Sequence, residues 1–192
     1  LRERFETEDL VLFWTDKKNF RKDVEPTYKG NRTKRKPAGY AKLKKWCMST
    51  WKSVMKPGLE ADDALGIVAT QGNVSNFVLV SPDKDMEQIP CRIYNLKREF
   101  TQTPEEAERK LYHQCLTGDS TDGYRGCPGV GPKRADLILD NREGTYWTNC
   151  VAAFEAAGLT YEDALKNLRL ARILQASDWD AENQQPILIT PQ

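Results

Sequence analysis

The chain has 192 residues, of which 39% are hydrophobic and 30% are charged, with a mean hydropathy of −0.68. This composition is typical of a water-soluble globular protein and excludes a disordered tail. No apolar run approaches the roughly 18 to 20 residues that a membrane-spanning helix needs, and the charged first segment predicts no signal peptide. The length predicts one large domain or two small ones, and the cysteine usage described next predicts reduced thiols in a cytoplasm.

Five cysteines and a single histidine, His113, limit the chemistry that the chain can perform. The cysteines are odd in number and form no Cys-x-x-Cys pair, so neither a disulfide scaffold nor a zinc site of Cys and His is predicted. His113 lies inside a helical pattern with no nucleophile motif near it. This placement disfavours a Ser-His-Asp or Cys-His mechanism.

The charge is unevenly distributed, although the net charge is only +1. Residues 29–56 contain ten Lys or Arg and no Asp or Glu, whereas residues 57–122 contain twelve Asp or Glu against six Lys or Arg. Cations beside aromatic rings suit contacts with phosphates and bases. They equally suit a solvated helix face or core packing, but the density of the basic segment favours nucleic-acid contact. The interleaved aromatic residues are Tyr28, Tyr40, Trp46 and Trp51.

Apolar runs and helix start signals predict an α/β fold. Residues 10–15 and 76–81 are short continuous apolar runs, which are typical of strands buried on both faces in a parallel sheet. The sequence Thr103-Pro-Glu-Glu predicts a helix start, and Gly118 predicts the end of that helix. Further expected elements are helices at 40–56 and 61–70, a third strand at 91–94, a short helix from 133, helices over 145–176 with a start at 160–163, and a terminal strand at 186–190.

Carboxylates fall at the predicted strand ends, helix starts and loops, where an α/β sheet places its site. Like charges brought together there would repel, and two divalent ions, Mg²⁺ or Mn²⁺, would relieve the repulsion. Two ions about 4 Å apart can activate a water and stabilise the leaving oxygen in phosphodiester cleavage. Taken singly, each carboxylate also fits a helix N-terminus or a turn. The candidates are Asp16, Glu60, Asp62, Asp63, Asp83, Asp85, Asp119 and Asp122.

A glycine-rich turn, Gly126-Cys-Pro-Gly-Val-Gly-Pro-Lys-Arg-Ala135, precedes the short helix. It fits neither a P-loop nor a dinucleotide-binding fingerprint. Its glycines and the helix N-terminus predict a phosphate site, because backbone N–H groups and the helix dipole point at an anion. An ordinary helix–helix turn is the alternative, but Lys133 and Arg134 in the first turn oppose the dipole unless an anion lies nearby.

In this order, the motifs resemble those of the 5′-to-3′ exonuclease and flap endonuclease family. The resemblance covers about residues 10–140, and residues 170–174 are similar to the exonucleases of short-tailed bacteriophages. The matching segments are residues 13–21, Tyr28-Lys-Gly-Asn-Arg32, Glu60-Ala-Asp-Asp63, Ser81-Pro-Asp-Lys-Asp85, Gly118-Asp-Ser-Thr-Asp-Gly123 and Gly129-Val-Gly-Pro-Lys133.

This resemblance implies a PIN-like α/β fold, with a mostly parallel sheet flanked by helices and a helix–three-turn–helix element. The implied parts are a nuclease core at 1–118, the helix–three-turn–helix region at 119–150 and C-terminal helices at 151–192. It also implies a metal-dependent nuclease that acts on 5′ ends or flaps of duplex DNA or on RNA–DNA hybrids, in a bacterial host cytoplasm if it is phage-encoded.

The resemblance further assigns roles to individual residues. A first metal ion would use Glu60, Asp62, Asp63 and Asp83, with Asp16 nearby, and a second would use Asp85, Asp119 and Asp122. Lys29 and Arg32 would engage the scissile phosphate. The turn from Gly129 to Lys133 would hold duplex DNA and a K⁺ ion. The remaining DNA-binding candidates are Lys34, Arg35, Lys36, Gly131 and Arg134.

Two departures from the family pattern leave alternatives open. No strand with a further Asp precedes Leu10, so we expect that N-terminal strand to be missing. Gly123 stands where many family members carry Asn, which makes the second metal site less certain than the first. The alternatives are a DNA-binding remnant without catalysis and a PIN-type ribonuclease.

Overall fold

The computed structural model describes residues 1–32, 36–73 and 75–191. Its helices are α1 (Arg2–Phe5), α2 (Arg21–Val24), α3 (Tyr40–Thr50), α4 (Ala61–Thr70), α5 (Pro104–Thr117), α6 (Pro132–Leu139), α7 (Tyr146–Ala156) and α8 (Tyr161–Ala171), with 3₁₀ turns η1 (Lys84–Gln88) and η2 (Ala176–Asp178). Its strands are β1 (Val11–Phe13), β2 (Lys52–Val54), β3 (Leu79–Val80), β4 (Arg92–Tyr94), β5 (Glu99–Thr101), β6 (Gly118–Asp119), β7 (Tyr124–Arg125), β8 (Trp179–Asp180) and β9 (Gln185–Pro186). The α/β class is confirmed.

The strands form several small sheets, so the expectation of one mostly parallel sheet was wrong. β1 pairs in parallel with β2, and β3 pairs in parallel with β4, which continues antiparallel to β5. The two expected buried strands therefore lie in different sheets, and β1 is only partly covered. The expected helix at 40–56 ends at Thr50, because residues 52–54 pair with β1 as strand β2.

Helix boundaries follow local capping signals. Thr103 accepts a hydrogen bond from the N–H of Glu106, whose side chain accepts from the N–H of Thr103. Thr160 and Asp163 make the same reciprocal pair at the start of α8. Both starts were predicted, because a capping box needs only residues three apart. Of the predicted terminal strand, Pro186 belongs to β9, which pairs with β8, and the N–H of Ile187 donates to the carbonyl of Asp178 at 2.8 Å.

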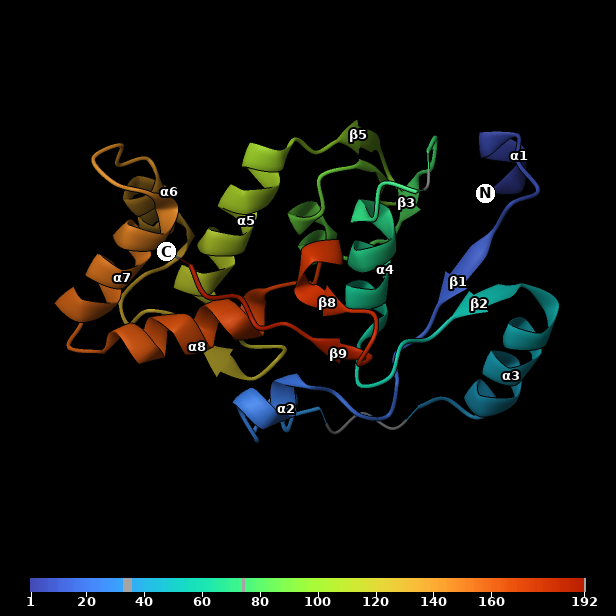
Figure 1. Cartoon of the computed structure of the whole chain (residues 1–192), viewed down its shortest axis with the longest axis horizontal. Helices are drawn as coiled ribbons and strands as arrows, with labels where there is room; N and C mark the ends of the chain where they lie inside the picture. Colours follow the sequence, from blue (N-terminus) through green and yellow to red (C-terminus); the bar gives the residue numbers. More distant parts are fainter. Residues whose placement is uncertain (33–35, 74, 192) are drawn as a thin grey trace.

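Helices α5, α6, α7 and α8 gather at one end of the molecule, and the β1–β2 sheet with α1 and α3 lies at the other (Figure 1). The largest buried cluster joins side chains of α5, α6, α7 and α8 with Tyr28 and Tyr124. It draws residues from each of the three ranges that were expected as separate parts. Two smaller clusters pack α4 against the segment after α8 and against the β3–β4 sheet.

No helix in the described ranges is long and apolar enough to cross a bilayer.

Candidate active site

Two sequence motifs that lie ninety residues apart meet at one place. The side chain of Asn31 donates to the carbonyl of Ser120 at 2.8 Å, and the backbone N–H of Lys29 donates to the carbonyl of Asp122 at 2.7 Å. The hydroxyl of Tyr28 donates to Asp122 at 2.7 Å and lies 3.0 Å from Glu60. The segment from Tyr28 to Arg32 is thus fastened to the β6–β7 loop and to the start of α4.

Lys29 and Arg32 lie beside carboxylates of this site. The ammonium of Lys29 bonds to Glu60 and lies 3.5 Å from Asp122, and the Arg32 guanidinium is 2.5 Å from Asp122. Burial opposes ionisation of Glu60, but the charges of Arg21 and Lys29 prevail and lower its pKa. Glu60 and Asp122 are therefore carboxylates whose charge this chain already offsets.

Asp62 belongs to a part of the site with excess negative charge. Burial, together with the charges of Asp83, Glu60 and Asp63, raises its pKa to about 7. Burial and the charges of Asp83 and Asp119 likewise raise the pKa of Asp85. Three segments, at α4, η1 and β6, thus bring carboxylates close enough to repel one another.

Tyr124 is a second feature that fits a bound cation beside these carboxylates. Its hydroxyl is buried and makes no hydrogen bond with any described residue. Burial and the charges of Asp119 and Asp85 raise the pKa of this phenol well above its ordinary value. Buried hydroxyls normally have a partner, so a hydrated cation beside these carboxylates fits the site. Within the described ranges no three carboxylate, thiol or imidazole groups converge tightly enough to enclose an ion directly. Mg²⁺ usually keeps several of its waters.

Two of the eight candidate carboxylates are used elsewhere. Asp63 is fully buried, and both of its oxygens accept from Arg21 at 2.8 Å, with further bonds from the N–H groups of Glu60 and Leu174. Asp16 accepts from the N–H groups of Lys17 and Gly58, which lowers its pKa and ties the end of β1 to the loop before α4. The oxygens of both carboxylates therefore accept hydrogen bonds from donors of the chain itself.

Arg21 is a residue whose role the sequence did not reveal. It is 3% exposed, and besides Asp63 it donates to the carbonyls of Leu170 and Arg172 and lies 3.5 Å from Glu60. A basic residue next to Phe20 in a charged segment gives no sign of burial. Only its spatial partners, 42 and about 150 residues away, define its role.

Gly123 shows why one departure from the family pattern is harmless to the backbone. Its φ is +82°, a conformation that glycine adopts freely and that asparagine tolerates better than other side chains. Either residue can therefore occupy this position of the loop that carries Asp119 and Asp122. The oxygen of Asp119 accepts from the N–H groups of Thr121 and Asp122, which orders that loop.

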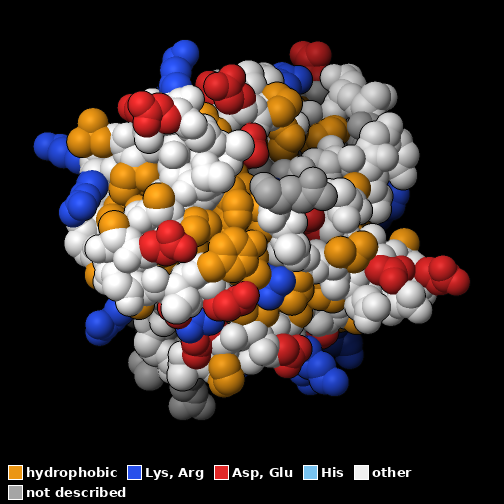
Figure 2. Space-filling view, turned by 60° about the vertical axis from the view of Figure 1, so that its left-hand side comes forward, with side chains coloured by type: hydrophobic (Ala, Val, Ile, Leu, Met, Phe, Trp, Pro, Cys, Tyr) orange, Lys and Arg blue, Asp and Glu red, His pale blue; other side chains and the backbone are white. Residues whose placement is uncertain are grey.

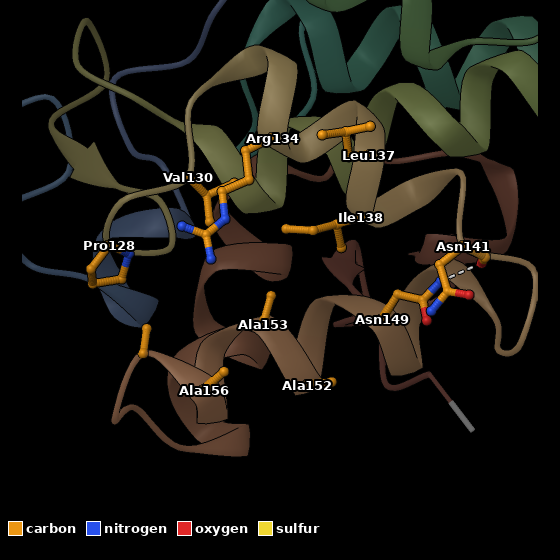
Figure 3. A pocket seen from close by; sticks show the side chains of 11 residues that line it. Pro128, Val130, Arg134, Leu137, Ile138, Asn141, Asn149, Ala152, Ala153 and Ala156 are labelled. Carbon is orange, nitrogen blue, oxygen red and sulfur yellow. Dashed lines mark hydrogen bonds between the residues drawn. The ribbon is translucent and has the colours of Figure 1, made fainter.

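The glycine-rich turn leads into α6 as expected. Gly131 precedes the first helical residue, Pro132, and no acidic residue lies in the first turn. Lys133 is exposed, and Arg134 reaches back to the carbonyl of Gly129 at 3.5 Å. Arg134 also lines a groove of about 610 Å³ between α6 and α7, together with Ile138 and the alanines of α7 (Figure 3). Hydrophobic side chains gather in the middle of this end of the molecule (Figure 2).

The basic segment forms an exposed helix. No residue of α3 is buried, and Trp46 and Tyr40 are 54% and 37% exposed. Lys36 lies over the Tyr40 ring, and Lys44 donates to the carbonyl of Thr15, whose hydroxyl accepts from the first N–H of α4. This basic face therefore begins next to the carboxylates. The predicted DNA-binding residues Lys34 and Arg35 lie outside the described residues.

The chain is similar in sequence to nucleases of known phages. Residues 1–112 match the model for the 5′-3′ exonuclease N-terminal resolvase-like domain. The exodeoxyribonuclease of Enterobacteria phage T3 is 31% identical, over 95% of this chain and 73% of that protein. The exonuclease of Escherichia phage T7 is 30% identical, over 95% of this chain and 74% of that protein.

Solved structures of phage T5 proteins share the fold. A mutant of the T5 5′-exonuclease superposes with a TM-score of 0.69 at 21% identity, covering 88% of this chain and 76% of that one. The T5 flap endonuclease, crystallised with DNA and metal ions, superposes with a TM-score of 0.63 over the same shares of the two chains. With the match over residues 1–112, these findings show that the chain belongs to the 5′-3′ exonuclease family.

Proposed function

We propose that the chain is a divalent-metal-dependent 5′-to-3′ exodeoxyribonuclease that hydrolyses phosphodiesters at 5′ ends of duplex DNA, with flaps and RNA–DNA hybrids as further substrates. One observation carries the proposal. Carboxylates from α4, η1 and the β6–β7 loop repel one another beside Lys29 and Arg32, in a chain that belongs to this family.

The oxygen-only donor set suits Mg²⁺ or Mn²⁺. Asp16 and Asp63 take no part, and Asp62 and Asp83 serve the first ion together with Glu60. When bound, two such ions supply an activated water and neutralise charge at the leaving oxygen. The proposed holders of the two ions are Glu60, Asp62 and Asp83 for the first, and Asp85, Asp119 and Asp122 for the second.

The residues of the chain itself would position the substrate. Glu60 and Asp122 would help to hold the ions, and Lys29 and Arg32, which lie beside these carboxylates, would donate to the nonbridging oxygens of the scissile phosphate. Lys29 is held for this task, because its backbone N–H is bonded to the carbonyl of Asp122. Both cations then offset charge that develops in the transition state.

Two surfaces would hold the DNA. The helix–three-turn–helix region at 119–150, with Gly129, Gly131, Lys133 and Arg134, would contact the duplex backbone and a K⁺ ion. Its support is a helix N-terminus with exposed basic residues and no acidic ones. The basic segment with Lys36 and α3 would contact the DNA strand that extends beyond this duplex-binding region. Phosphate contacts of this kind make binding sequence-independent and weaker at high salt.

Cleavage assays with three 5′-labelled substrates test the proposal. Duplex DNA, a 5′ flap and single-stranded RNA are each incubated with Mg²⁺ or with EDTA. We expect release of 5′ products from the DNA substrates in Mg²⁺ and none in EDTA. DNA binding without cleavage in Mg²⁺ would instead indicate a catalytically inactive remnant. Preferential cleavage of single-stranded RNA would indicate a PIN-type ribonuclease.

A further inference from the structure

A series of hydrogen bonds through two buried side-chain amides connects Asp85 to the end of α8. The side-chain nitrogen of Gln88 donates to the carbonyl of Ala171 at 2.9 Å and to the side-chain oxygen of Gln114 at 2.7 Å. The side-chain nitrogen of Gln114 donates in turn to Asp85 at 3.1 Å. Gln88 is 1% exposed and Gln114 is 8% exposed, so water does not compete for these bonds.

Backbone groups fix the orientation of both side-chain amides in this hydrogen-bonded series. The side-chain oxygen of Gln88 accepts from the N–H of Ile173 at 3.1 Å, and a backbone N–H can only donate. Its nitrogen faces the carbonyl of Ala171, which can only accept. Gln114 must therefore turn its oxygen to Gln88 and its NH₂ group to Asp85. A reversed amide at either residue would set two donors or two acceptors against each other.

The same backbone segment, residues 170–174, is also connected to the carboxylates Asp63 and Glu60 at the start of α4. The carbonyls of Leu170 and Arg172 accept from Arg21, which pairs with Asp63 and lies beside Glu60. Helix α4 packs directly on the segment, because a Cβ at Gly66 would lie 2.3 Å from the carbonyl of Leu174. Residues 170–174 thus reach Asp85 through Gln88 and Gln114. They reach Asp63 through Arg21.

We propose that Gln114 and Gln88 are positioning residues for Asp85, and that the backbone of residues 170–174 sets their orientation. The inference rests on the proposed function, in which Asp85 serves the second metal ion. The NH₂ group of Gln114 occupies one oxygen of Asp85 and so fixes how the other is presented. Outer partners of this kind typically change metal affinity 10- to 100-fold when they are removed.

Equilibrium binding of Mn²⁺, followed by electron paramagnetic resonance without substrate, tests this inference. Gln114→Met keeps the size of the side chain and removes both hydrogen bonds. We expect the variant to bind one of two ions 10- to 100-fold more weakly and the other within twofold of the wild type. Gln88→Met should weaken the same ion to a smaller extent, because it only releases the orientation of Gln114.

A control separates positioning from general loss of stability. Phe154→Leu opens space in the α7 core, away from the carboxylates, and should lower the unfolding temperature without changing either Mn²⁺ affinity. Gln114→Asn keeps a buried amide and is one methylene shorter; it carries the test should Gln114→Met not fold, with the same expected loss. Wild-type Mn²⁺ affinity in a folded Gln114 variant overturns the inference and leaves the proposed function standing. Absence of Mn²⁺ binding by the wild type overturns both.

Discussion

Asp83→Asn is expected to reduce Mg²⁺-dependent cleavage about a thousandfold or more, since loss of metal-based charge stabilisation costs several kcal/mol and each 1.36 kcal/mol is a factor of ten in rate. The charge of Asp83 helps to raise the pKa of both Asp62 and Asp85, so its carboxylate lies near proposed holders of both ions. Asparagine keeps the acceptor oxygen that caps η1 at the N–H of Asp85, 3.0 Å away. The fold should therefore remain unchanged. Single-turnover rates on 5′-labelled duplex give the measurement.

Two further variants, Asp83→Ala and Glu87→Gln, test whether the loss comes from the carboxylate of Asp83. Asp83→Ala should lose activity to the same extent and also lose the cap, while its DNA affinity stays within about tenfold because phosphate contacts dominate binding. Glu87→Gln removes a charge from the same 3₁₀ turn, where Glu87 pairs with Lys110 at 3.0 Å, and should cleave as the wild type does. Full activity of Asp83→Asn would remove Asp83 from the mechanism.

Arg21→Met should lower the free energy of unfolding by about 3–5 kcal/mol, which is the typical cost of leaving one partner of a buried ion pair without the other. The variant leaves the fully buried Asp63 without its two bonds from Arg21 and leaves the carbonyls of Leu170 and Arg172 without that donor. Denaturant unfolding at neutral pH gives the measurement. Cleavage should fall as well, because Arg21 lies 3.5 Å from Glu60.

An exposed ion pair provides the matched control for Arg21. Lys166 lies 3.6 Å from Glu25 on the surface, with 43% of its side chain exposed, and Lys166→Met should cost less than about 1 kcal/mol. Replacing both buried partners, as Arg21→Met with Asp63→Leu, should recover part of the lost stability, because no unpaired charge then remains buried. A loss below 1 kcal/mol in Arg21→Met alone would show that the pair does not hold α2 and α4 together.

Local signals in the sequence predicted the longer helices, but not α1 and α2 or the end of α3 at Thr50. The capping boxes at Thr103 and Thr160 act between residues three apart, and the apolar face of residues 61–70 repeats with the helical period. The strands were harder to predict. β2 has only three residues, which is too few to show a period, and its partner β1 lies 41 residues earlier in the chain.

The carboxylates show the limit of sequence reasoning most clearly. Asp62 and Asp63 are neighbours in one acidic motif, and their contrasting roles follow from the helix, which turns Asp63 toward Arg21 and Asp62 toward Asp83. Asp16 ends a strand as a metal ligand would, but that strand belongs to a different sheet from the one that Asp83 follows. Gln88 and Gln114 carry no charge or motif. Their role is visible only through the bonds that they make.

A carboxyl-detected ¹³C NMR titration with Mg²⁺ at neutral pH tests the central claim most directly, which is that acidic groups from three distant segments share divalent ions. We expect the side-chain carboxyl signals of Asp62, Asp83, Asp85 and Asp119 to move together as Mg²⁺ is added, while those of Asp16 and Asp63 stay in place. Signals that remain unchanged at millimolar Mg²⁺, or that move only for Asp16 and Asp63, would contradict it.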